Sequence, residues 1–219
     1  MGDSLSQTLL EARKLANTDP DRARAMFEAL AGTSPCGSWS EAQVELAYLA
    51  YHQWRLDEVA FRANAVLSLS DVATPWATAV AGVLTNLAAD WSDGPVDEDL
   101  LLRSAIACVD ANDPYNAAVA RSLVASSRLR AVDRRAAIGH LRAAADLYEA
   151  AGSMTGGAGV LLRLSDALVA NRDIDGAAVA LQRGLAHLAT FPYGGQDVRK
   201  LTEKVRAAEL ALRGARPRG

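Results

Sequence analysis

The sequence contains few of the residues on which metal centres and catalytic sites are usually built. It has only two cysteines and three histidines in 219 residues. Cys36 and Cys108 lie far apart with no CxxC spacing, which argues against a disulfide scaffold and suits a reducing compartment. The histidines, His52, His140 and His187, have no HExxH motif or closely spaced carboxylate partner. We therefore expect no metal site and no cofactor.

The sequence also lacks an excess of basic charge and a long apolar run. The formal net charge is −3 and the pI is about 5.6, which argues against a protein that holds nucleic acid by its phosphates. Residues 1–10 show no basic patch followed by an apolar core, so we expect a cytoplasmic protein. The longest uncharged stretch, Val72 to Ala89, contains Pro75 and Asn86. It predicts a buried helix rather than a membrane span.

Aromatic residues are scarce, and no segment alternates apolar and polar residues over the length of a strand. Aromatics make up 5% of the chain although half of the residues are hydrophobic, and alanine and leucine dominate that half. Both are strong helix formers, and apolar residues recur at helical spacing almost everywhere. The composition predicts an all-α protein whose helices pack closely through small side chains.

Turn and capping signals divide the chain into eleven expected helices joined by short loops. The first five are expected at about 3–16, from Pro20 after the cap Asp19, from Ser38 or Ser40 to near Trp54, from about Asp57, and after Pro75. The sixth to eighth are expected at about 97–110, from Pro114, and at about 133–151 with Gly152 as the C-cap. The last three are expected after the glycine-containing segment 152–159, after the turn 173–176, and after Gly194-Gly195.

A degenerate repeat runs through the chain. In the second helix of successive pairs a small residue is followed by apolar or small residues four and seven positions later. The four examples are Ala23, Phe27, Leu30; Val59, Ala63, Val66; Ala137, Leu141, Ala144; and Ala177, Leu181, Gly184. Their first residues are 36, 78 and 40 positions apart, so the middle gap holds two units and the missing one falls at 100–108. Such units bury their apolar faces only by stacking on their neighbours.

The repeat resembles the tetratricopeptide repeat (TPR). In the clearest copy, Leu161 to Leu188, Leu164 and Ser165 match the large-small pair of the motif, Ala177 its small residue and Leu181 its large position. Asp57-Glu58 is similar to its acidic turn. Arg172 and Trp54 depart from it, because the motif usually has glycine there. Residues 136–188 are also similar to the repeat region of large actinobacterial transcriptional activators.

This resemblance implies a TPR-like α-solenoid of about five antiparallel helix pairs with a C-terminal capping helix. It implies one repeat domain over residues 1–212 and a disordered tail, 213–219. In TPR-like stacks the first helix of each pair lines a concave face. The residues that the resemblance places in this partner-binding groove are Tyr48, Tyr51, His52, Leu87, Trp91, Ser126, Arg130, Leu162 and Asp166.

Three motifs that could carry other chemistry have simpler interpretations. Asn171, Asp173, Asp175 and Gly176 are spaced like half of a calcium loop, but Gln182 stands where the bidentate carboxylate should be, so we interpret this segment as a helix cap. The acidic segment 90–99 is typical of a helix start, although binding of a cation or of a basic partner is the alternative interpretation. The glycines at 156–159 lack the strand and lysine of a phosphate loop, and no serine or cysteine has a recognisable nucleophile motif.

The sequence therefore favours a non-enzymatic interaction module, a scaffold or regulatory protein of a bacterial cytoplasm that binds a protein or peptide in its groove. No nucleic acid or membrane partner is expected, and homodimer formation is left open. A ligand-sensing regulator that binds a small effector inside the helical stack is an alternative. A closed apolar pocket of about 300–1,000 Å³ would support it. A helical biosynthetic enzyme is the third alternative.

Overall fold

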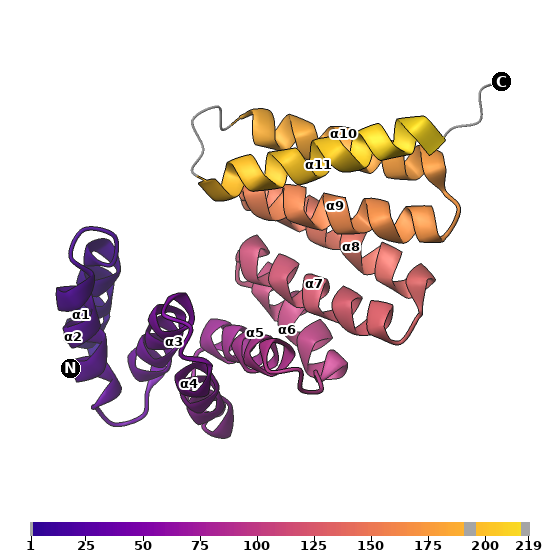
Figure 1. Ribbon diagram of the computed structural model, residues 1–219. Helices are drawn as coiled ribbons and strands as arrows, with labels where there is room; N and C mark the ends of the chain where they lie inside the picture. The colour runs from indigo at the N-terminus through magenta and orange to yellow at the C-terminus, as the bar shows by residue number, and fades with distance from the viewer. Residues whose placement is uncertain (1, 191–195, 216–219) are drawn as a thin grey trace. The chain divides into compact units, whose positions relative to one another are not determined.

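The computed structural model describes residues 2–190 and 196–215, and the side chains of 4–190 and 198–212. The described residues form eleven helices and no β-strand, so the predicted all-helical class is confirmed (Figure 1). The helices are α1 (Gly2–Leu15), α2 (Pro20–Ala31), α3 (Gly37–His52), α4 (Leu56–Ser68), α5 (Pro75–Trp91), α6 (Glu98–Asp110), α7 (Pro114–Arg130), α8 (Arg134–Ala150), α9 (Met154–Ala170), α10 (Ile174–Ala189) and α11 (Gln196–Ala215).

Most helix starts lie where an aspartate or threonine precedes a proline or an amphipathic run. In six of them the cap side chain accepts a hydrogen bond from the backbone N–H three residues later, which satisfies one of the unpaired donors of the first turn. These caps are Asp19, Thr74, Asp97, Asp113, Asp133 and Asp173. The interpretation of Asp173 as a helix cap rather than a calcium ligand agrees with its 2.9 Å bond from the N–H of Gly176.

The start of α3 differs from the prediction. Ser38 or Ser40 was expected to cap this helix, but both lie inside it, and Cys36 occupies the cap position without a side-chain hydrogen bond. The hydroxyl of Ser40 instead donates to the carbonyl of Gly37 at 2.7 Å and accepts from the N–H of Thr74 at 3.2 Å. The serine therefore joins the start of α3 to the start of α5.

The glycine-containing segment 152–159 was also predicted wrongly as a lead-in to the ninth helix. Only Gly152 has a left-handed backbone, with φ of 68°, and α9 begins at Met154. Gly156 and Gly157 lie within α9, at positions where neighbouring side chains leave no room for a Cβ. A Cβ on Gly157 would stand 2.9 Å from Nδ1 of His187.

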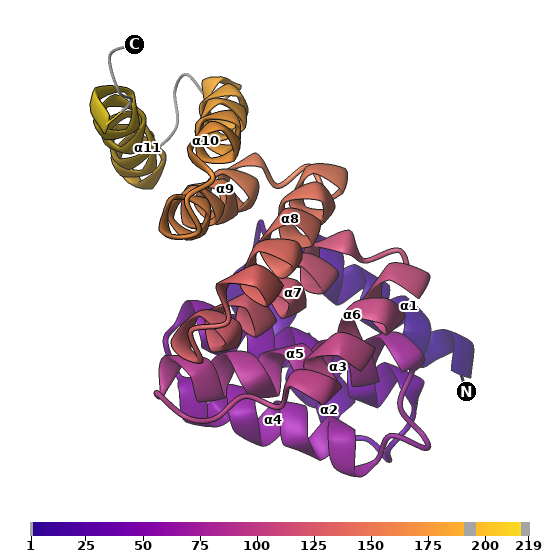
Figure 2. The same ribbon diagram turned by 90° about the vertical axis from the view of Figure 1, so that its right-hand side faces the viewer.

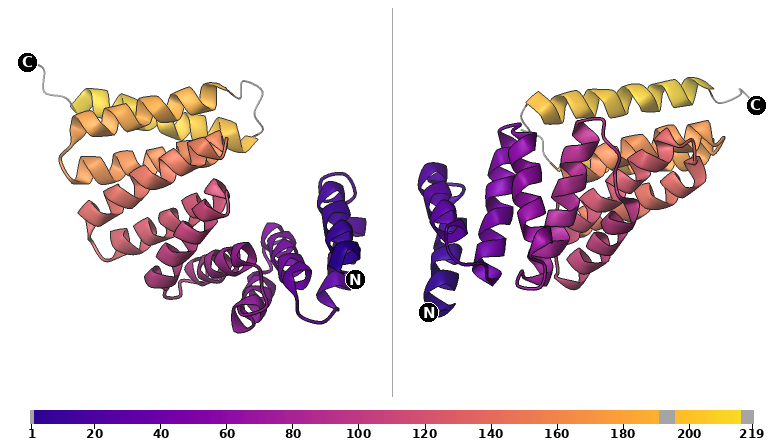
Figure 3. Two further views of the ribbon diagram at one scale, coloured as in Figure 1. Left: turned by 180° about the vertical axis from the view of Figure 1, so that it is seen from behind. Right: turned by 90° about the horizontal axis from the view of Figure 1, so that it is seen from below.

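The chain divides into two compact units. Unit 1 is Met1–Ala111 and unit 2 is Asn112–Gly219. In unit 1 each helix packs on the next, and α3 also packs on α1 and α5. The right panel of Figure 3 shows these helices, coloured indigo to purple, side by side. The predicted single domain, 1–212, stays a prediction.

In unit 2, α7 to α11 also pack in chain order, and α11 covers α9 as well as α10. Figure 2 shows α9, α10 and α11 nearly end-on as three neighbouring coils. Val205 and Leu212 of α11 are buried in the apolar core of this unit. Of the predicted disordered tail, residues 213–215 belong to α11 and residues 216–219 lie outside the described residues.

The repeated apolar stripe is buried throughout. All twelve residues of the four sequence triplets are buried. The sixth helix, where the missing unit was placed at 100–108, carries the same spacing at Leu101, Ala105 and Cys108, which are 0%, 2% and 0% exposed. One set of small and medium side chains therefore recurs at the buried side of α2, α4, α6, α8 and α10.

Short turns of one geometry end six of the helices. The second residue after each helix has a left-handed φ of 54–68°. These residues are Trp54, Asp93, Asn112, Val132, Gly152 and Arg172. In five of the turns the N–H of the following residue bonds to the carbonyl five positions earlier, as in Schellman caps. Only one of the six is glycine, the residue that adopts this backbone without strain.

Candidate functional site

One exposed stripe runs along α3. Ser38, Glu41, Glu45, Tyr48 and His52 follow one another at three- and four-residue spacing, so they share one side of the helix. His52 is exposed and the other four are half-buried. α3 packs on α1, α2, α4 and α5, and Arg13 of α1 reaches the stripe at Glu41 and Glu45. Tyr48 and His52 are two of the residues that the resemblance placed in the groove.

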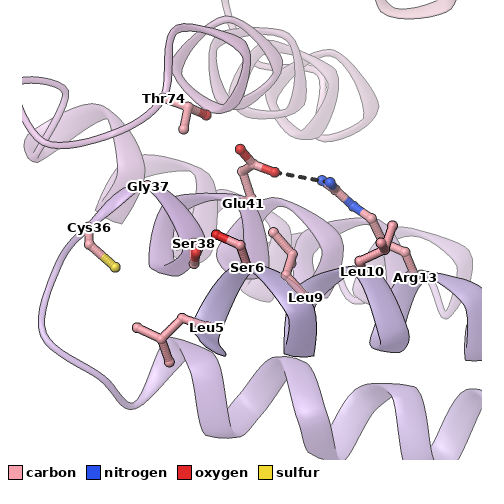
Figure 4. A pocket seen from close by; sticks show the side chains of 10 residues that line it. All are labelled: Leu5, Ser6, Leu9, Leu10, Arg13, Cys36, Gly37, Ser38, Glu41 and Thr74. Atoms are coloured by element: carbon pink, nitrogen blue, oxygen red, sulfur yellow. Dashed lines mark ion pairs between the residues drawn. The ribbon is translucent and has the colours of Figure 1, made fainter. Parts of the chain in front are cut away.

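A pocket of about 920 Å³ opens at the beginning of this stripe. Its walls come from α1, from the start of α3 and from Thr74, as Figure 4 shows. Leu5, Leu9 and Leu10 supply the apolar wall, and Leu10 is 54% exposed. The thiol-bearing Cys36 also lines the pocket. The sequence analysis did not predict this site, because its residues come from three segments that share no motif.

An arginine of α1 marks the far edge of the pocket. The guanidinium of Arg13 pairs with Glu41 at 3.0 Å and with Glu45 at 2.6 Å, and its Cζ lies 5.1 Å from the ring centroid of Trp76. The dashed line in Figure 4 marks the pair with Glu41. Two carboxylates face one guanidinium, so this part of the stripe keeps one negative charge.

An aromatic cluster lies at the other end of the stripe. The ring centroids of Trp54 and Trp91 are 4.9 Å apart in an edge-to-face arrangement, and Tyr51 lies 6.4 Å from Trp54 and 5.7 Å from His52. The two tryptophans are 65% and 51% exposed. The structure thus brings together three predicted groove residues, Tyr51, His52 and Trp91. Leu87, a fourth, is half-buried one turn before Trp91.

Trp54 is the cluster member that the sequence analysis missed as a site residue. Its signal was present, because Trp54 stands where the repeat motif usually has glycine. The structure gives it the left-handed φ of 59° that this position requires. A bulky residue with such a backbone costs about 1–2 kcal/mol relative to its preferred conformations. We call the surface from the leucine-lined pocket along the stripe to Trp54 and Trp91 the α3 face.

The remaining predicted groove residues belong to unit 2. Ser126 and Arg130 lie on α7, and Leu162 and Asp166 lie on α9. The hydroxyl of Ser126 accepts a 2.5 Å hydrogen bond from Arg163. Leu162 is half-buried and packs against the apolar core, and Arg130 is exposed. Because these four residues and the α3 face belong to different units, the structure describes them as two separate sets.

Asp166 lies in a small pocket with basic walls. Arg134 and Arg163 line this 210 Å³ pocket together with Asp166, Leu129 and two alanines. Asp166 as a whole is exposed, but desolvation of its carboxyl by the surrounding pocket raises the pKa above its ordinary value of 3.8. The charged form of this carboxyl is therefore less favourable in the folded chain than in water.

An ion network that no sequence motif indicated joins α8 to α10. The carboxylate of Glu149 contacts the guanidinium of Arg183 and lies 3.2 Å from Nε2 of the buried His187. Asp146 accepts a hydrogen bond from Arg183 at 2.8 Å. Arg183 first and His187 second lower the pKa of Glu149. The acidic residues of this network are exposed, and the network links α8 to α10.

Among the residues whose side chains are described, no three His, Cys, Asp or Glu residues are grouped so as to hold a metal ion. None of the helices in the described part of the chain is both long and apolar enough to cross a membrane.

Comparison with known proteins identifies a similar fold. No protein-family model matches the sequence, and no curated protein matches it either. The crystal structure of BtubC (BKLC) from P. vanneervenii is similar over 99% of this chain and 92% of that chain, with a TM-score of 0.51 and 16% sequence identity. At this level of identity the likeness concerns the fold alone. The protein therefore shares an all-helical architecture with a solved structure over almost its whole length.

Proposed function

We propose that this protein is a non-catalytic, TPR-like interaction module that binds a segment of another protein along the α3 face. The repeated stripe supports the TPR-like part of the proposal. Five helices bury the same three-residue pattern, and within each unit every helix packs on the next one in the chain. Stacked helix pairs of this kind leave one side of each first helix for binding. In this scheme α11 is the capping helix.

The exposed tryptophan pair is the observation that carries the proposal. Trp54 and Trp91 expose more than half of their surface although both are large and apolar. Tryptophan is among the residues that contribute most to protein interfaces, because one side chain can cover a large apolar area and still donate a hydrogen bond.

The dimensions of the α3 face suit a short peptide. The 16 residues of α3 span roughly 24 Å, so an extended segment of about seven residues reaches from the leucine-lined pocket to the tryptophans. An apolar side chain fits the wall of Leu5, Leu9 and Leu10. The net negative charge around Arg13 favours a segment that also carries a lysine or arginine.

The proposed setting is a bacterial cytoplasm, where the protein acts as a scaffold or regulator. In the described structure Cys36 and Cys108 form no disulfide, which is compatible with a reducing compartment.

The volume of the pocket favours a small effector as a second candidate ligand. At about 920 Å³ it falls in the range of small-molecule sites. Its wall at Leu10 is open to solvent, which favours an inserted side chain over an enclosed molecule. Thermal unfolding in the presence of metabolite fractions distinguishes the two. A metabolite that raises the melting temperature of wild type but not of Leu10→Glu would show that the ligand of the pocket is a small effector and not a peptide.

Selection from a displayed peptide library tests the proposal. The affinity of the best peptide is then measured by titration calorimetry for wild type, Trp91→Ala and Leu10→Ser. We expect each variant to lose at least tenfold in affinity, which corresponds to about 1.4 kcal/mol. Phe61→Ala and Leu210→Ser are the matched controls, because these side chains are 71% and 68% exposed on α4 and α11. Unchanged binding by Trp91→Ala, or an equal loss in the controls, would contradict the proposal.

A further inference from the structure

The turn between α3 and α4 is held by side chains on both sides of Trp54. Before it, the amide oxygen of Gln53 accepts a hydrogen bond from Arg24 of α2 at 3.3 Å. After it, the guanidinium of Arg55 pairs with Glu58 in the first turn of α4 at 2.5 Å. Both arginines meet at the same carboxylate, since the guanidinium of Arg24 also lies 3.6 Å from Glu58. The two chain neighbours of Trp54 are therefore tied into one network.

Glu58 is the centre of this network. A third guanidinium, that of Arg62 one turn further along α4, contacts its carboxylate at 2.8 Å and donates to the buried Gln43 of α3 at 3.1 Å. The side chain of Glu58 is only 20% exposed. A half-buried carboxylate with several charged donors is held more firmly than an exposed single ion pair. The network therefore links α2, α3 and α4 next to the turn that carries Trp54.

The residue after Trp54 departs from the pattern of the other turns. In three of the other left-handed turns the next residue is an aspartate whose side chain caps the following helix, namely Asp113, Asp133 and Asp173. Arg55 occupies that position before α4, and in the described structure its side chain makes no cap bond. An arginine has no acceptor to offer the unpaired N–H groups of a first turn. The side chain of Arg55 contacts Glu58 instead.

The network acts on the position of the turn and not on its shape. Two backbone hydrogen bonds close the turn, from the N–H of Trp54 to Tyr51 at 2.9 Å and from the N–H of Arg55 to Ala50 at 3.0 Å. Such local bonds set the left-handed φ of Trp54. The contacts of Gln53 and Arg55 reach other elements, so they set where the turn lies against α2 and α4. The exposed ring of Trp54, 4.9 Å from that of Trp91, lies on this turn.

We propose that Arg55 and Glu58 position Trp54 for partner binding, with the arginine standing in place of the usual helix cap. The inference rests on the proposed function of the α3 face. A side chain that is held in place before binding loses less conformational freedom when a partner covers it, so the partner binds more tightly. Neither residue needs to touch the partner, because both act through the turn.

Restoring the cap separates positioning from stability. Asparagine caps helices as well as aspartate does, and it places no new carboxylate beside Glu58. We expect Arg55→Asn to keep the melting temperature of wild type, because the new cap bond offsets the lost ion pair. The same variant should bind the peptide selected from the library about fivefold more weakly, because Trp54 must be ordered on binding. Circular dichroism melts and titration calorimetry measure the two effects.

The tryptophan pair provides a signal that needs no partner. Two indole rings in edge-to-face contact couple their electronic transitions, which gives a paired positive and negative band in the far-ultraviolet circular dichroism spectrum. Trp91→Ala identifies this band, because it removes one of the two rings. We expect Arg55→Asn to weaken the band and to leave the helical signal unchanged. Arg55→Lys keeps the charge and one donor for Glu58, so it should retain more of the band and of the affinity than Arg55→Asn.

Ser153→Asn is the matched control. Ser153 follows the left-handed Gly152 and precedes α9, and it also lacks a side-chain cap bond in the described chain. The substitution should leave the band and the peptide affinity unchanged. An Arg55→Asn variant with the band of wild type would overturn the inference, and so would a loss of affinity accompanied by a lower melting temperature. Full peptide affinity in Trp91→Ala would instead contradict the proposed function, and the band would still decide whether Arg55 holds Trp54.

Discussion

The turn residues show how single positions depart from the local rules of helix ends. Val132 has a left-handed φ of 62°, which is uncommon for any residue other than glycine and most costly for a β-branched one. Its side chain is 66% exposed, so it gains little from packing. Gly152 occupies the corresponding position after the next helix with φ of 68°. The comparison between these two turns separates backbone strain from side-chain contacts.

We expect Val132→Gly to raise the free energy of unfolding by about 1 kcal/mol, because the strain at φ of 62° is removed. The reciprocal change, Gly152→Val, should lower it by about 1–3 kcal/mol. Urea unfolding followed by circular dichroism measures both. A loss of stability in Val132→Gly would show that the valine side chain contributes more than its exposure indicates.

Asp166 predicts a pH-dependent effect. Its pKa is raised, so folding favours the protonated carboxyl, and the stability that this gives is present below the ordinary pKa of 3.8 and is lost as pH rises through the folded-state value. Asp166→Asn should therefore raise stability at about pH 7 and leave it unchanged at about pH 3. Urea titrations across this range provide the measurement. Asp71→Asn, in an exposed loop, serves as the control, and a gain for Asp166→Asn that is equal at both pH values would refute the burial argument.

At the scale of elements, close approach of α5 to α6 depends on a glycine. A Cβ on Gly82 would collide with Oγ of Ser104 and come within 3.2 Å of Cδ1 of Leu100. Gly139, on α8, has no atom within 4 Å of the same position. The two glycines thus have the same helix propensity and opposite surroundings.

Gly82→Ala should lower the free energy of unfolding by about 1–3 kcal/mol, because α6 must move away. Gly139→Ala should raise it by about 1 kcal/mol through helix propensity alone. Thermal and urea melts of the two variants test this difference in sign. Stabilisation by both alanines would mean that α6 shifts at no cost.

Local signals predicted most helix starts, and tertiary context decided the rest. Asp19-Pro20 and Asp113-Pro114 combine a cap with a first-turn proline, and both helices begin as expected. The start of α3 was missed because Ser40 bonds to another helix, which no local pattern reveals. Trp54 lies in the turn after α3 and Trp91 ends α5. The two are far apart in sequence, so their contact could not be predicted from spacing. The resemblance placed Tyr51, His52 and Trp91 on helices that do adjoin, while their role stays a prediction.

At the scale of the whole molecule, α11 covers α9 and α10 of unit 2. Val205 is fully buried and Leu212 is 7% exposed, both in the core that α9 and α10 share. A chain that ends at residue 195 loses this cover. The sequence predicted a last helix from its apolar spacing.

We expect the chain shortened after residue 195 to melt at a lower temperature and to bind a hydrophobic dye, because apolar surface of α9 and α10 becomes exposed. Calorimetry and dye fluorescence measure the two effects. Leu210→Ser in the full chain is the control, since Leu210 is 68% exposed. A shortened chain with the melting temperature of the full one would show that α11 is not a cap.

The positions of the two cysteine thiols give an independent way to follow the leucine-lined pocket. Cys36 lines its wall and is half-buried, whereas Cys108 is 0% exposed within α6. A maleimide dye should therefore attach at one place under native conditions, without mutagenesis. A fluorophore there would report occupancy through its emission, so that binding at the mouth of the pocket could be timed in the unmodified sequence.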